Sequence, residues 1–64
     1  MKVRDMIRML ESDGWHTVRT RGSHRVMKHA VKPGIVVVPG HMSHELAPGT
    51  LKSIRDQAQM EERS

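Results

Sequence analysis

The chain has 64 residues, enough for one small domain with a thin hydrophobic core. It contains no cysteine, which excludes disulfides, thiolate metal ligands and cysteine nucleophiles. No apolar run is close to the length of about 18 residues that a membrane-spanning helix needs. The formal net charge is +4, and residues 14–44 include no Asp or Glu but contain all five histidines. This distribution is typical of a polyanion-binding protein, although a merely solvated basic face has the same composition. We expect a single cytoplasmic domain over 1–64, with an ordered core of about 2–59.

The first predicted element is an amphipathic helix over residues 3–13. Its apolar side chains recur at helical spacing and share one face: Val3, Met6, Ile7 and Leu10. Gly14 is placed to end the helix in a left-handed conformation.

Three short strands are predicted next, over residues 15–21, 24–29 and 35–38, with short turns between them. Such turns favour an antiparallel meander. A second helix is predicted to begin near Ala47–Pro48, and the polar tail 60–64 is expected to fray. The fold class is therefore α+β: an α-β-β-β-α two-layer domain with two helices on one face of a three-stranded antiparallel sheet.

The third predicted strand is apolar on both faces. Ile35 and Val37 point one way, and Val36 and Val38 the other. Only one face can lie under the helices, so the other indicates a protein partner, unless the tail folds back over it.

The run Gly22-Ser23-His24-Arg25 is the best candidate for chemistry. RNA cleavage requires a proton to leave the attacking 2′-hydroxyl and another to reach the departing 5′-oxygen, and histidine exchanges protons near neutral pH. Gly22 and Ser23 offer backbone N–H groups and a hydroxyl to a phosphate, and Arg21 and Arg25 flank the group. A lone strand histidine is more often a surface or hydrogen-bonded residue, so the run alone leaves that alternative open.

The other histidines form no recognisable site. His29 is expected on the strand face opposite His24, His41 and His44 lie in a later loop, and His16 is expected to be plain surface. The histidines have no helical i, i+4 partners and no carboxylates among them. We therefore expect no metal and no cofactor. Ser23 also has no evident Asp-oriented base, which argues against a serine hydrolase.

Three blocks of sequence together are similar to a known family. They are Leu10-Glu11-Ser12-Asp13-Gly14-Trp15, then Arg19 through Arg25 with its Gly-Ser-His signature, then Val38-Pro39 through His41, Glu45-Leu46 and Pro48 through Ile54. Over about residues 2–58 the chain resembles the HicA toxins, small mRNA interferases of HicAB toxin–antitoxin modules. One departure lies at Gln59, where the family often continues with glycine and a further apolar segment.

The resemblance implies a fold like the double-stranded RNA-binding domain and an endoribonuclease that cleaves mRNA, inhibiting translation and growth. It implies that His24 is the catalytic residue and that a HicB-type antitoxin masks the site, in a toxin–antitoxin hetero-oligomer. From the chemistry of a histidine among cations we expect metal-independent cleavage. The predicted RNA-binding residues are Arg19, Arg21, Gly22, Ser23, Arg25 and Lys28.

Two other functions remain open on the sequence. One is a non-catalytic double-stranded-RNA-binding module, which needs only a basic strip that reads shape and 2′-hydroxyls. The other is protein interaction through the apolar sheet face, which is compatible with an enzyme.

Overall fold

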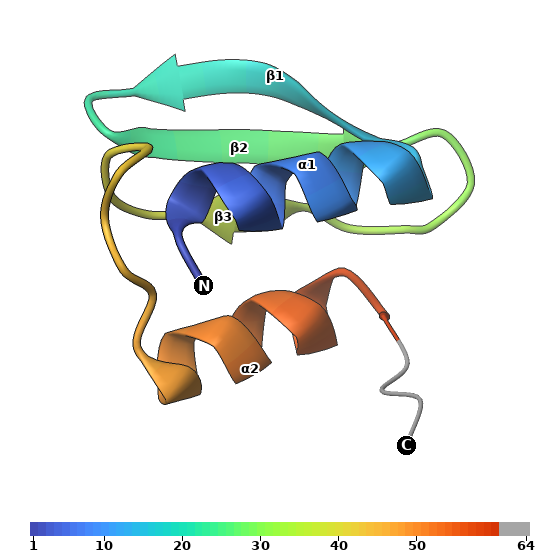
Figure 1. Cartoon of the computed structure of the whole chain (residues 1–64). Coiled ribbons are helices and arrows are strands. Elements are labelled where there is room, and N and C mark those ends of the chain that lie inside the picture. The colour runs from blue at the N-terminus through green and yellow to red at the C-terminus, as the bar shows by residue number, and fades with distance from the viewer. Residues whose placement is uncertain (61–64) are drawn as a thin grey trace.

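The computed structural model describes residues 1–60 and has the predicted order of elements (Figure 1). They are α1 (Val3–Asp13), β1 (Trp15–Arg21), β2 (His24–His29), β3 (Val36–Val38) and α2 (Pro48–Gln57). The α+β arrangement is confirmed. Strand β3 starts one residue later than expected, because Ile35 belongs to the preceding loop and is 46% exposed. Of the tail expected to fray, 61–64 lie outside the described residues, whereas Met60 packs against the core.

The strands form one antiparallel sheet in the order β1-β2-β3. Thr17 pairs with Met27, and Met27 pairs with Val36, so these three residues share a sheet face. The register of β1 against β2 shifts between Thr17 and Arg19, which leaves Val18 as the extra residue of a bulge.

One continuous core lies between the helices and this face of the sheet. Residues of both helices belong to it, so the predicted two-layer packing is confirmed. The core residues are Val3, Met6, Ile7, Leu10, Trp15, Met27, Val36, Val38, Leu46, Ile54 and Ala58. Neither helix in the described part of the chain has the length and apolarity needed to span a membrane.

The loop before α2 is fixed to the start of α1 by backbone hydrogen bonds. The first N–H groups of a helix have no partner within it. Here Val3 N donates to the His44 carbonyl at 2.9 Å and Arg4 N to the Met42 carbonyl at 3.1 Å. Leu46 N returns a bond to the Met1 carbonyl at 2.9 Å. The loop therefore supplies acceptors to the first helical N–H groups, and the Asp5 carboxylate accepts from Lys2 N at 3.2 Å beside them.

The opposite end of α1 is held by the loop between β2 and β3. His29 Nε2 lies 2.6 Å from the Asp13 carbonyl oxygen. Lys32 Nζ contacts the Asp13 carboxylate at 2.5 Å and also donates to the carbonyl of Ala58 at 3.2 Å. This one ammonium group thus ties the last turns of both helices together.

Candidate nucleic-acid interface

The face of the sheet turned away from the helices is basic. Met27 is buried under the helices, so strand alternation directs its neighbours on β2 to the other face. Cross-strand partners share a face, and Arg21 pairs with His24, Arg19 with Val26, and His16 with Lys28. The resulting basic face consists of the exposed side chains of His16, Arg19, Arg21, His24 and Lys28.

The turn between β1 and β2 determines where His24 lies. Gly22 has a φ of +60°, in the left-handed region that glycine adopts without a steric cost, and nothing lies within 4 Å of a Cβ placed there. The turn therefore requires glycine for its backbone and not for a close contact. It brings His24 to the first position of β2, directly opposite Arg21.

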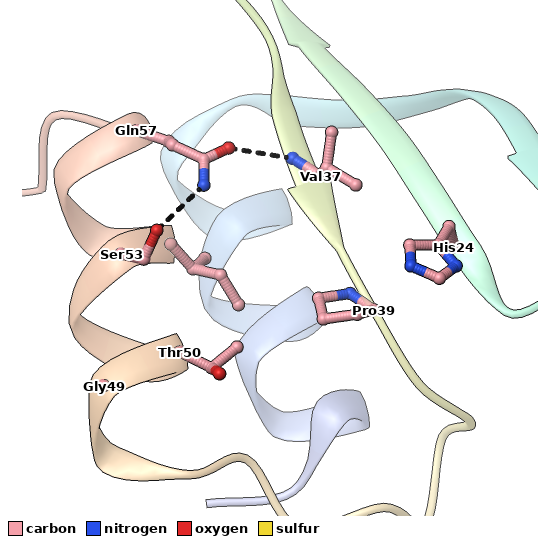
Figure 2. Close-up of a pocket in the computed structure, with 8 residues that line it drawn as sticks. His24, Val37, Pro39, Gly49, Thr50, Ser53 and Gln57 are labelled. Carbon is pink, nitrogen blue, oxygen red and sulfur yellow. Dashed lines mark hydrogen bonds between the residues drawn. The ribbon is translucent and has the colours of Figure 1, made fainter.

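His24 also lines a pocket of about 370 Å³ between β3 and α2 (Figure 2). Val37 and Pro39 lie on the strand side, and α2 contributes the opposite wall. The α2 residues at the pocket are Gly49, Thr50, Ser53, Ile54 and Gln57.

A chain of hydrogen bonds crosses this pocket at its far end (Figure 2). Val37 N–H, on the outer edge of β3, donates to Gln57 Oε1 at 3.2 Å. Gln57 Nε2 in turn donates to Ser53 Oγ at 3.2 Å. The Gln57 side chain thus accepts from a backbone N–H at the edge of the sheet, where a further strand would otherwise provide the acceptor.

Comparison with known protein families identifies the chain. Residues 3–60 match the family described as the HicA toxin of bacterial toxin–antitoxin systems. The chain belongs to the HicA toxin family. It is therefore a toxin component of a toxin–antitoxin system, and it has an antitoxin partner in the general sense of that family. None of the curated proteins compared with the chain matches it.

Arg25 of this HicA chain does not lie with the other predicted RNA-binding residues. It pairs with Val38, whose side chain is in the core, so it faces the helices. Its Nη1 donates to the Gly40 carbonyl at 3.3 Å and, at a longer 3.5 Å, to the Ser23 carbonyl. The structure therefore separates Arg25 from Arg19, Arg21 and Lys28, and its contacts hold the turn before His24.

The remaining histidines of the HicA chain have distinct positions. His29 lies on the face of the sheet that is turned toward the helices, and His24 lies on the other face. The prediction that these two histidines lie on opposite faces is therefore confirmed. His16 lies on the basic face, and His41 and His44 are exposed in the loop before α2. Within residues 1–60, no three His, Asp or Glu side chains are grouped as metal ligands.

The α2 wall of the pocket was not predicted from the sequence. Thr50, Ser53 and Gln57 recur at helical spacing on one side of α2, with polar side chains next to the buried Ile54. That spacing was visible in the sequence, but nothing in it indicated that this side of α2 would lie across from His24.

Proposed function

We propose that this HicA toxin is an mRNA interferase, an endoribonuclease that inhibits translation by cutting mRNA in the cytoplasm. The observation that supports it is the place of His24: exposed, opposite Arg21 on the basic face, and at the rim of a pocket. Arg19, Arg21 and Lys28 provide the positive charge that a phosphate backbone binds.

The chemistry follows from one histidine beside cations. His24 removes the proton from a 2′-hydroxyl, O2′ forms a bond to the adjacent phosphorus, and the P–O5′ bond breaks. The departing 5′-oxygen takes a proton from the histidinium or from water. The products carry a 2′,3′-cyclic phosphate and a 5′-hydroxyl. Arg21 stabilises the additional negative charge on the phosphate during the reaction, and the backbone N–H groups of Gly22 and Ser23 can contribute to that stabilisation.

The direct test is RNA cleavage by the purified protein in EDTA. We expect cleavage by the wild type, a loss of at least about 100-fold in His24→Ala, and products with cyclic phosphate ends. His16→Ala is the matched control, since it removes another exposed histidine from the same face. Failure of the wild type to cut RNA in EDTA, or equal rates for His24→Ala and the wild type, contradicts the proposal.

The basic face also favours a second candidate, a non-catalytic reader of double-stranded RNA. The two functions differ in cells. Induction of an mRNA interferase arrests growth, and His24→Ala relieves the arrest while leaving RNA binding largely intact. A non-catalytic binder shows no His24-dependent arrest.

A HicB-type antitoxin is the proposed partner, covering the basic face in a hetero-oligomer. Val26 and Val37 form a half-buried apolar centre of this face, which a protein partner can cover. Co-purification with the product of a neighbouring HicB-like gene tests this. We expect the complex to protect RNA from cleavage.

A further inference from the structure

The pocket beside His24 has a lining that differs from the basic face around it. Among residues 1–60, the pocket is lined by no Lys, Arg, Asp or Glu side chain, and His24 is the one titratable group that lines it. Val37, Pro39 and Ile54 make its apolar part, whereas Thr50, Ser53 and Gln57 add hydroxyl and amide groups. A small cleft with apolar walls and a few polar groups is typical of a site that binds a neutral, hydrogen-bonding molecule.

The polar groups of the pocket are oriented. Gln57 is fixed by its bond from Val37 N, and its amide N–H then donates to Ser53 Oγ. Because Ser53 Oγ is the acceptor in that bond, its hydroxyl hydrogen is not donated to Gln57 and can be donated to a bound molecule. Figure 2 shows Thr50 one turn earlier on α2, on the same side as Ser53. Gln57 is therefore a positioning residue, and the two hydroxyls are the groups that a ligand would meet.

The protein has no exposed Phe, Tyr or Trp side chain with which to stack a base. Proteins that bind single-stranded RNA usually hold bases on Phe, Tyr or Trp. The one aromatic residue here, Trp15, is 1% exposed and belongs to the core. A base beside the cleaved bond has no large aromatic platform here, so the shaped pocket and hydrogen bonds to its edge supply the contacts that a Phe, Tyr or Trp would otherwise give.

From this lining we infer that the pocket binds the base of a single unpaired ribonucleotide next to the cleaved bond. The inference rests on the proposed function and adds substrate recognition to it. The base packs on Val37 and Pro39, its edge meets the hydroxyls of Thr50 and Ser53, and its phosphate lies outside, between His24 and the arginines of the basic face. The pocket thereby gives the enzyme a base preference at the cut site.

The first experiment measures that preference. A pool of RNA with randomised sequence is cut by the wild type, and the ends are sequenced. We expect one favoured base beside the cut, and a reduction of its advantage by about three- to tenfold in Ser53→Ala and in Thr50→Val, as for loss of one hydrogen bond. Ser12→Ala, which removes an exposed hydroxyl from α1, is the control and leaves the preference unchanged. Identical cut-site preferences in all four proteins overturn the inference.

The second experiment separates the inference from the proposed cleavage. The wild type is titrated with each of the four ribonucleoside 3′-monophosphates, and with inorganic phosphate, while backbone amide NMR signals are recorded. We expect saturable shifts at Val37, Thr50 and Ser53 with a nucleotide but not with phosphate, and a dissociation constant about three- to tenfold higher in Ser53→Ala. Equal shifts with phosphate, or none with any nucleotide, overturn the inference. Nucleotide binding without RNA cleavage would support the base-binding pocket and contradict the nuclease function. Cleavage that depends on His24 without nucleotide binding would support the nuclease function and contradict the base-binding pocket.

Discussion

His29 is a structural residue because both of its ring nitrogens are occupied. Nε2 lies 2.6 Å from the Asp13 carbonyl, and Nδ1 accepts from the backbone N–H groups of Val31 at 2.9 Å and Lys32 at 3.0 Å. The neutral ring protonated on Nε2 satisfies all three contacts. The ring also meets Trp15 edge to face, with centroids 5.3 Å apart.

Replacing His29 should therefore cost stability. In His29→Phe, one carbonyl and two N–H groups lose their partner, so we expect the free energy of unfolding to fall by about 2–3 kcal/mol in urea denaturation. His16→Ala, at an exposed position, should change it by less than about 0.5 kcal/mol. Equal stabilities for the two variants would show that the His29 contacts contribute nothing.

Gly14 is required for two reasons that can be separated. Its φ is +106°, and a Cβ at this position would lie 2.6 Å from His29 Nε2. Gly34 has a similar φ of +82° but nothing within 4 Å of such a Cβ. Gly34→Ala should thus cost about 1 kcal/mol for the backbone conformation alone.

Gly14→Ala should cost more, about 2–4 kcal/mol, because the methyl group also displaces His29 from the Asp13 carbonyl. Thermal unfolding of both variants measures the difference. If they unfold at the same temperature, the close approach of His29 has no energetic consequence.

At the scale of elements, α2 ends in a turn that fits glycine better than the residue present. Gln59 has a φ of +54°, and the bonds from Gln59 N to the Asp56 carbonyl and from Met60 N to the Arg55 carbonyl make a Schellman motif. The departure from the family pattern at Gln59 thus lies at the left-handed position of this turn. The fold accommodates a side chain there at an energetic cost.

Gln59→Gly should stabilise the protein by up to about 1 kcal/mol, because glycine adopts this φ without strain. Gln59→Ala is the matched control, since it keeps the Cβ and should give no gain. The measurement is the urea midpoint of the three proteins. A Gln59→Gly variant no more stable than Gln59→Ala would mean that the turn stores no strain.

The contact between the two helix ends depends on Lys32. Its hydrogen bond to the Asp13 carboxylate is the main reason that the pKa of Asp13 is below the ordinary value of 3.8, and its charge acts in the same direction. Trp15 also lowers the pKa of Asp13, less strongly than Lys32 does. Its buried indole N–H nevertheless makes no hydrogen bond within residues 1–60. The Lys32 and Asp13 side chains are 26% and 32% exposed, so solvent screening limits the pair to about 1 kcal/mol.

For the whole molecule, this pair predicts how stability depends on pH. A carboxyl whose pKa is lowered by folding binds fewer protons in the native state, so its contribution is present above pH 3.8 and is lost as the pH falls through the lower folded value. Lys32→Met should therefore be less stable than the wild type at pH 7, and the part of the difference due to Asp13 should disappear at strongly acid pH. Urea denaturation from pH 2 to pH 7 measures this. A difference independent of pH would assign the effect to other contacts of Lys32.

The order of elements was predictable because each depends on local signals. The helical spacing in residues 3–13, Gly14 after it, and Pro48 at the start of α2 fixed the element bounds within a residue or two. The alternation of side chains along a strand likewise predicted that His24 and His29 lie on opposite faces of the sheet. Applied to Arg25, the same alternation would have placed it on the face opposite His24, where the structure has it.

The rest depended on contacts between distant parts of the chain. The wall that Thr50 and Ser53 form opposite His24 and the bond from Val37 to Gln57 join residues at least 20 positions apart. The bonds of Lys32 Nζ to the Asp13 carboxylate and to the Ala58 carbonyl join residues 19 and 26 positions apart. No local pattern encodes which side of α2 faces β3. The catalytic role of His24 and the RNA contacts of Arg19, Arg21, Gly22, Ser23 and Lys28 stay predictions.

The backbone bonds between the first residues and the loop 42–46 determine when this protein can fold. During translation α1 is synthesised first, but its N-terminal N–H groups find their acceptors only when Met42 and His44 have been added. Ile54 and Ala58, which complete the core, are added later still. With a core this small and contacts this non-local, a nascent chain cannot reach the native state early. The native core of the described domain therefore becomes available only after Ala58 has been synthesised.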